Sequence, residues 1–149
     1  MKSILNFILE SINTSNLSEL LKSNKCFKAI YSSPKAENDF ERSIQKLGYT
    51  LITINANMDG KPEDLYDNDN IINEINDSEK PVVIIVRNLE SANKNQVNDL
   101  MSLLLDKKFN KNIKKSYSMC LGIRNNKIDD FNENIPSPVK SKYKETINC

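Results

Sequence analysis

Short apolar runs recur along the chain and are separated by polar or amphipathic stretches. Residues 82–86, Val-Val-Ile-Ile-Val, form the clearest run, bounded by Pro81 on one side and by Arg87 and Asn88 on the other. Such a run predicts a strand buried on both faces, as in a parallel sheet. Weaker runs of the same kind predict three more strands, at residues 27–32, 49–55 and 117–123.

Between these strands, apolar residues recur at helical spacing. The pattern predicts two short amphipathic helices within residues 3–23, a helix at 37–47 that Gly48 ends, and a short helix around 71–75. The strongest stripe predicts a helix that faces the sheet and ends near Phe109; it consists of Val97, Leu100, Met101, Leu104 and Leu105. Residues 58–69 are polar and predict a loop.

Strands that alternate with helices predict an α/β fold, with a mostly parallel sheet flanked by helices. A length of 149 residues fits a single domain with one core. We expect N-terminal helices at residues 1–24, the core at 25–143 and a tail at 144–149, because little apolar content follows Pro136. The period of the pattern leaves the order of the strands open.

Composition narrows the class of protein. Hydrophobic residues make up 38% and charged residues 28% of the chain, which is typical of a soluble domain. No apolar run reaches the roughly 18 residues that a membrane-spanning helix needs, so we expect no membrane insertion. The chain has no His, and Cys26, Cys120 and Cys149 are far apart in sequence. These features argue against a disulfide framework, a zinc site or another cofactor, and favour a cytoplasmic location.

Charge is unevenly distributed, although the net charge is only +1. Residues 55–80 contain eight acidic and two basic side chains, whereas residues 107–149 contain ten basic and four acidic ones. The densest basic cluster consists of Lys107, Lys108, Lys111, Lys114 and Lys115. Two oppositely charged surfaces would select oppositely charged partners, or would simply be solvated.

The end of the 82–86 strand carries unexpected residues. In α/β proteins the ligand binds where the parallel strands end, and a nucleoside triphosphatase places acidic groups there for Mg²⁺ and water. This strand is followed by Arg87 and Asn88 instead. The first strand and helix are joined through residues 30–40, which contain no Gly, although a phosphate loop needs Gly to turn its N–H groups inward. The layout of a nucleotide hydrolase is thus present without its hydrolytic groups.

In this order, the segments from residue 25 to residue 143 resemble the core of an AAA+ ATPase domain, most closely the MoxR-type branch. The resemblance implies a P-loop NTPase fold in which the Walker A and Walker B residues are lost. It places Asn38 where the family has its phosphate-binding Lys and Asp39 where it has the Mg²⁺-binding hydroxyl. Lys35 keeps a positive charge nearby, at a shifted position. A flavodoxin-like or receiver-like domain remains the alternative fold, although no predicted strand ends in the acidic residue that a receiver needs.

The same resemblance places the remaining members of the degenerate site. Arg87 and Asn88 stand at the two acidic Walker B positions, and Asn125 stands at the sensor 1 position that orients water. Lys142 stands at the arginine-finger position, where Lys is a poorer clamp for a γ-phosphate than Arg. Glu90 could be mistaken for a catalytic base but lies beyond the strand. No counterpart of the helical lid domain follows, which leads us to expect a monomer.

These observations favour a protein that is not an enzyme. The first hypothesis is a catalytically inactive AAA+-like domain that acts as a protein-interaction or scaffold module, joining a larger assembly or an active ATPase. The alternative is a nucleic-acid-binding domain that uses the basic C-terminal third, whose phosphate contacts would be salt-sensitive. An enzyme of unrelated chemistry is the weakest hypothesis, because no Cys has an evident base beside it and no His is present.

Overall fold

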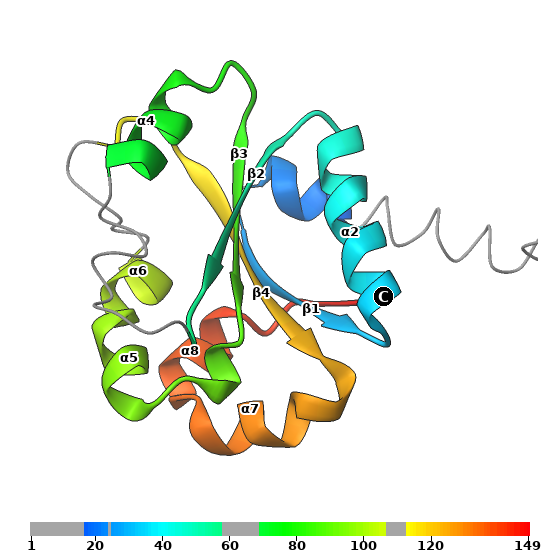
Figure 1. The fold of residues 1–149 in the computed structure, drawn as a ribbon, viewed down its shortest axis with the longest axis vertical. Helices are drawn as coiled ribbons and strands as arrows, with labels where there is room; N and C mark the ends of the chain where they lie inside the picture. Colours follow the sequence, from blue (N-terminus) through cyan, green and yellow to red (C-terminus); the bar gives the residue numbers. More distant parts are fainter. Residues whose placement is uncertain (1–16, 24, 58–68, 107–112) are drawn as a thin grey trace, which may run out of the picture.

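The computed structural model describes residues 17–23, 25–57, 69–106 and 113–149, and shows one sheet of five parallel strands (Figure 1). The strands are β1 (Cys26–Tyr31), β2 (Thr50–Asn55), β3 (Val82–Arg87), β4 (Tyr117–Arg124) and β5 (Thr146–Asn148). Their order across the sheet is β2-β3-β4-β1-β5, so β2 and β5 are the edge strands. The α/β class and the four predicted strands are confirmed.

The central strands are apolar because both of their faces are covered. All five residues from Val82 to Val86 are buried, as a strand between two layers of helices requires. The parallel register pairs Tyr31 with Arg124 and Asn55 with Arg87. The strands therefore end together on one side of the sheet, which we call the carboxyl edge.

Two layers of helices enclose the sheet (Figure 1). A helix at residues 17–22 and α2 (Pro34–Lys46) cover the first face, which we call the α2 face, with Leu17, Leu21, Phe40 and Ile44 buried against it. The second face is covered by α4 (Asp69–Asp77), α5 (Lys94–Asp99), α6 (Met101–Asp106), α7 (Ile128–Asn134) and α8 (Ser137–Lys142). The predicted apolar face of the second N-terminal helix is confirmed.

Local sequence explains where α2 begins and ends. Ser33 caps the helix by accepting a hydrogen bond from the N–H of Ala36, and Pro34 occupies the first turn, where its missing N–H costs nothing. The helix therefore begins three residues before the predicted start at residue 37. Gly48 follows the helix with a φ of 93°, a conformation that favours glycine, and this end is confirmed.

The predicted helix over residues 97–105 is wrong in one respect, because the structure has two short helices there. α5 ends at Asp99 and α6 begins at Met101. The N–H of Leu100 bonds to the carbonyls of both Gln96 and Val97, and this tighter turn separates the two helices. As a consequence Leu103 is buried, while Met101 and Leu105, which belonged to the predicted stripe, are only half-buried.

The C-terminal segment is a larger correction. Residues after Pro136 were expected to be polar, and residues 144–149 to be a tail outside the core. They instead form α8 and β5, and β5 extends the sheet beside β1. Val139, Tyr143 and Ile147 supply the missing apolar content, and all three are buried. Tyr143 also donates a hydrogen bond of 2.8 Å from its hydroxyl to the carbonyl of Leu104.

Several expectations fall outside the described residues. They include the first amphipathic helix near the N-terminus, most of the predicted loop at 58–69, and Lys107, Lys108 and Lys111 of the basic cluster. Within the described ranges, none of the helices is long and apolar enough to span a bilayer.

Candidate functional site

The junction between β1 and α2 lies at the carboxyl edge, where a P-loop would hold phosphate. Only Ser32 and Ser33 separate the strand from the helix. The Ser33 hydroxyl already accepts from the N–H of Ala36 at 3.1 Å, and the Ser33 carbonyl accepts from the N–H of Glu37. The junction is too short to form a loop around a phosphate, and its helix N-terminus is capped by the chain itself.

The three polar candidates on α2 are all exposed. Lys35 lies in the first turn of the helix, whereas Asn38 and Asp39 lie in the second turn. Asp39 accepts a hydrogen bond through its backbone carbonyl from the Ser43 hydroxyl, 2.8 Å away. Because phosphate binds at the first N–H groups of a helix, Asn38 and Asp39 lie a turn beyond the place where a phosphate would be held.

Arg87 forms an ion pair with Glu41, and this contact crosses the carboxyl edge from β3 to α2. The Arg87 Nη2 group donates to Glu41 Oε2, and the two side chains are 31% and 15% exposed. Burial alone would lower the pKa of Arg87, but the hydrogen bond and the charge of Glu41 outweigh it, and the pKa is raised. A positive charge is therefore fixed at the end of β3.

Tyr31 fills the space beneath this ion pair. Its side chain is 1% exposed, and its ring centroid lies 5.7 Å from that of Phe40. A Cβ atom at Gly122 would lie 2.9 Å from the Tyr31 hydroxyl, so only glycine in β4 leaves room for the ring. Burial raises the pKa of Tyr31, whose hydroxyl makes no hydrogen bond. The aromatic rings of Tyr31 and Phe40 thus fill the interior between β1 and α2.

Asn88 has a structural role in this arrangement. It adopts the left-handed conformation, with φ of 59° and ψ of 27°, which Asn tolerates better than most residues. Its Nδ2 donates to Asn55 Oδ1 at 3.0 Å, and the same oxygen accepts from the N–H of Asn57. The two amide side chains join the ends of β2 and β3.

Glu90 is buried rather than open to solvent. It lies in the one-turn helix η1 (Leu89–Ser91) with 5% exposure, and its Oε2 has no hydrogen-bond partner. Burial raises its pKa, whereas Lys127 and Arg124 lower it and Asp130 raises it further. Asn134 of α7 donates to the Glu90 backbone carbonyl at 3.4 Å. The Glu90 side chain is therefore enclosed by its own chain.

The remaining predicted site residues are not brought together. Asn125 is exposed at the start of η2 (Asn125–Lys127), immediately after β4. Lys142 ends α8, and its ammonium group donates to the backbone carbonyl of Leu105. Of the basic cluster, Lys114 is exposed and Lys115 is half-buried. The Lys142 side chain is therefore bonded to its own chain.

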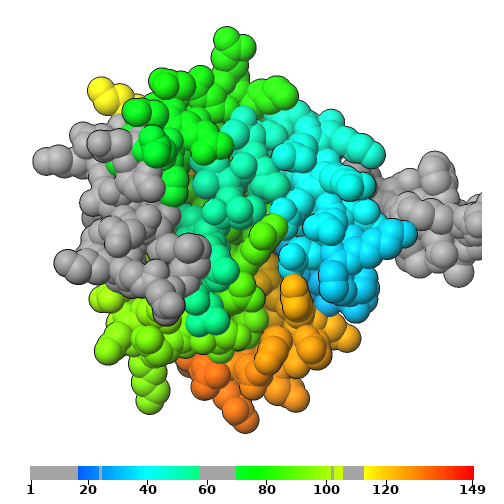
Figure 2. Space-filling view, viewed as in Figure 1, coloured from blue at the N-terminus to red at the C-terminus, as the bar shows by residue number. Residues whose placement is uncertain are grey.

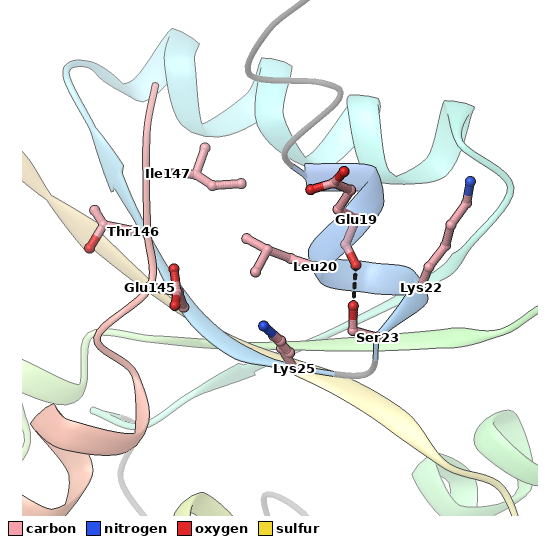
Figure 3. Close-up of a pocket in the computed structure, with 8 residues that line it drawn as sticks. All are labelled: Glu19, Leu20, Lys22, Ser23, Lys25, Glu145, Thr146 and Ile147. Carbon is pink, nitrogen blue, oxygen red and sulfur yellow. Dashed lines mark hydrogen bonds between the residues drawn. The ribbon is translucent and has the colours of Figure 1, made fainter.

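A surface pocket of about 510 Å³ lies elsewhere, at the end of the sheet where β1 and β5 begin (Figure 3). Its lining consists of Glu19, Leu20, Lys22, Ser23, Lys25, Glu145, Thr146 and Ile147. Two acidic and two basic side chains balance its charge. Across the described parts of the chain, no three His, Cys, Asp or Glu side chains are grouped so that they could hold a metal ion.

Sequence reasoning missed two contacts near the carboxyl edge, that of Glu41 with Arg87 and that of Gly122 with Tyr31. Glu41 lies beside Phe40 and one turn before Ile44, so the buried face of α2 could have located it. A charged Arg87 at the end of a buried strand also implied a carboxylate partner. The contact of Gly122 with Tyr31 carried no signal in the sequence, because it depends on the pairing of β1 with β4.

The sequence matches no known family profile, and no curated protein is similar to it in sequence. Solved structures nevertheless share its fold. NtrX from Brucella abortus has a TM-score of 0.61 at 13% identity, over 99% of this chain and 36% of that one. The Thermotoga maritima RuvB Holliday junction branch migration motor gives 0.57 at 15%, over 100% and 48%. The ORC2 protein of Aeropyrum pernix gives 0.56 at 11%, over 99% and 48%.

These neighbours are AAA+ ATPases, and the likeness shows that this chain has the P-loop AAA+ type of α/β fold. At such low identity it shows the fold alone. The chain spans less than half the length of each of these structures.

Proposed function

We propose that this chain is a catalytically inactive AAA+-like domain that binds no ATP and acts as a protein-interaction or assembly module. The observation that carries the proposal is the ion pair between Arg87 and Glu41, with Tyr31 packed beside it, in place of a phosphate loop and a metal site. We also propose, from sequence alone, a relation to the MoxR-type branch and a cytoplasmic location.

The electrostatics of the carboxyl edge support this proposal. Catalysis of phosphoryl transfer depends on positioning and on cations that neutralise the phosphate charge. Here the carboxylate of Glu41 already neutralises Arg87, and Glu37 and Asp39 add negative charge on α2. A triphosphate would have to break the ion pair and approach two further carboxylates. The nucleotide complexes described for ORC2 and NtrX belong to those proteins.

The retained fold supports an interaction role. The sheet has a buried apolar core on each face, beneath a layer of helices. Such a stable fold can present a docking surface even if the domain carries out no chemistry. A protein partner, such as a larger assembly or an active ATPase, suits a nearly neutral chain better than a polyanion does. Nucleic-acid binding through the basic C-terminal third remains the alternative, and its test is described in the Discussion.

Thermal unfolding in the presence of nucleotide tests the proposal. Mg-ATP and Mg-ADP, each at millimolar concentration, should leave the unfolding temperature unchanged relative to MgCl₂ alone. A ligand present at a hundredfold excess over its dissociation constant would add about 2.7 kcal/mol to the free energy of unfolding. A saturable upward shift with either nucleotide, absent with MgCl₂, would overturn the proposal.

A further inference from the structure

The two edges of the sheet differ in how well they are protected. β5 is three residues long, and shortness is one of the ways in which proteins protect a sheet edge. β2 is six residues long, with the sequence Thr-Leu-Ile-Thr-Ile-Asn. It contains no charged residue, no Pro and no Gly, so it lacks the usual devices that prevent pairing with another strand.

The hydrogen bonds of β2 show which backbone groups face outward. Thr50 and Ala56 donate their N–H groups toward β3, to Pro81 and Arg87 respectively. Because backbone groups alternate along a strand, the peptide groups of Leu51, Thr53 and Asn55 point away from β3. Within the described part of the chain, no strand pairs with this outer edge.

The side chains of the same three residues leave room for a neighbour. Thr53 is exposed, and Leu51 and Asn55 are half-buried, all on the α2 face of the sheet. The surface of β2 is visible beside α2 in the space-filling view (Figure 2). Among the residues that the structure describes, the outer edge of β2 is therefore unpaired and can serve as a template for backbone pairing.

We infer that β2 is a self-association surface, on which a second copy of this chain pairs its own β2 in antiparallel orientation. A twofold axis at Thr53 would place Thr53 opposite Thr53 and Leu51 opposite Asn55. Each of these opposed residues has an outward N–H and C=O, so all three positions meet as hydrogen-bonded pairs. The two sheets would join into one, and the interface would be isologous and closed.

The chemistry of the strand favours a second copy over a charged partner. The side chains of β2 are uncharged, so two β2 strands meet without repulsion between their own residues. Facing Thr residues also form a favourable cross-strand pair. This inference deepens the proposed assembly role and departs from the monomer that we expected from the sequence. Self-association does not depend on nucleotide binding. A negative result in the sedimentation experiment can therefore be told apart from a negative result in the nucleotide experiment.

Sedimentation velocity of the full chain over a wide concentration range tests the inference. The wild-type chain should show a reversible monomer–dimer equilibrium. Thr53→Lys places two ammonium groups opposite each other and should raise the dissociation constant about tenfold or more, while its exposed position leaves folding intact. The matched control, Thr146→Lys on the β5 edge, should leave the dimer unchanged.

Cross-linking tests the register. In a Cys149→Ser background, Thr53→Cys should form an intermolecular disulfide, because opposed hydrogen-bonded residues have Cα atoms about 5.5 Å apart. Asn57→Cys should not cross-link to itself, since it would lie opposite Tyr49. A monomer at every concentration would overturn the inference. Growth into open chains that Thr146→Lys abolishes would also overturn it, because that result would indicate head-to-tail pairing of β2 with β5.

Discussion

At the scale of single residues, the main feature of the carboxyl edge is an ion pair between β3 and α2. The positive charge of Arg87 is paired with the negative charge of Glu41. Both side chains are partly exposed, so solvent weakens the interaction relative to a fully buried pair. The pair nevertheless connects α2 to β3 at the carboxyl edge.

A double-mutant cycle measures this contact. Arg87→Met should lower the free energy of unfolding by about 1–3 kcal/mol, because it leaves the carboxylate of Glu41 half-buried without a partner. Glu41→Gln combined with Arg87→Met should recover part of the loss, since the unpaired charge is then removed. Chemical denaturation of the four proteins gives the coupling energy. Strict additivity of the two single changes would mean that the ion pair contributes nothing.

Glu90 gives a second prediction at this scale. Burial raises its pKa above the ordinary value of 4.5, so the folded state holds its proton more tightly than the unfolded chain does. The free energy of unfolding should therefore fall as the pH rises from about 4.5 through the raised pKa of the folded state. Glu90→Gln removes this titration and should be more stable than the wild type above that window, with the difference shrinking below it.

Urea denaturation at a series of pH values measures the effect. The control is Glu133→Gln on α7, which changes an exposed carboxylate and should leave the pH dependence as in the wild type. If Glu90→Gln and the wild type kept the same stability difference at every pH, the carboxyl group would have the same pKa in both states.

At the scale of secondary-structure elements, predictability followed the strength of the apolar signal. β3 and β4 were predictable because five or more consecutive residues are buried in each. β5 was not, because it has three residues of which only Ile147 is buried. The break at Leu100 depends on a local choice of hydrogen bonds that hydrophobic spacing does not encode.

In the candidate site, too, some residues could be predicted from the sequence and others could not. Arg87 and Asn88 could be located because they end a strand with an unmistakable pattern. Their partners, Glu41 and Asn55, come from segments that the sheet order brings near, and the periodicity left that order open. The assignment of Asn38 and Asp39 to phosphate and metal positions depended on where α2 begins, and the start at Pro34 moves both into the second turn.

Leu104 tests the packing of the second helical layer. Its side chain is fully buried, and its carbonyl accepts from the Tyr143 hydroxyl, so it joins α6 to the C-terminal segment. Leu104→Ala should lower the free energy of unfolding by about 2–5 kcal/mol, as expected when a buried side chain leaves a cavity. Met101→Ala on the same helix is the control, and its half-buried position should make it milder. A cost below about half a kcal/mol for Leu104→Ala would contradict this packing.

At the scale of the whole molecule, the domain keeps an AAA+ type of fold while its carboxyl edge is closed by its own side chains. In the C-terminal segment, two of the basic side chains bond to the chain itself. The ammonium groups of Lys140 and Lys142 donate to the backbone carbonyls of Asn132 and Leu105. Both ammonium groups therefore contact their own chain.

The last prediction follows from this distribution of charge. The chain should bind labelled single-stranded and duplex oligonucleotides of mixed sequence only weakly at physiological salt, because its net charge is only +1 and both Lys140 and Lys142 donate to carbonyls of their own chain. The triple variant with Glu at Lys111, Lys114 and Lys115 should unfold at nearly the same temperature as the wild type, since Lys114 is exposed, Lys115 is only half-buried, and charges that reach solvent contribute little to stability. Fluorescence anisotropy at low and physiological salt measures the binding. Micromolar affinity that persists at physiological salt and disappears in the triple variant would establish the nucleic-acid function in place of the protein-assembly role.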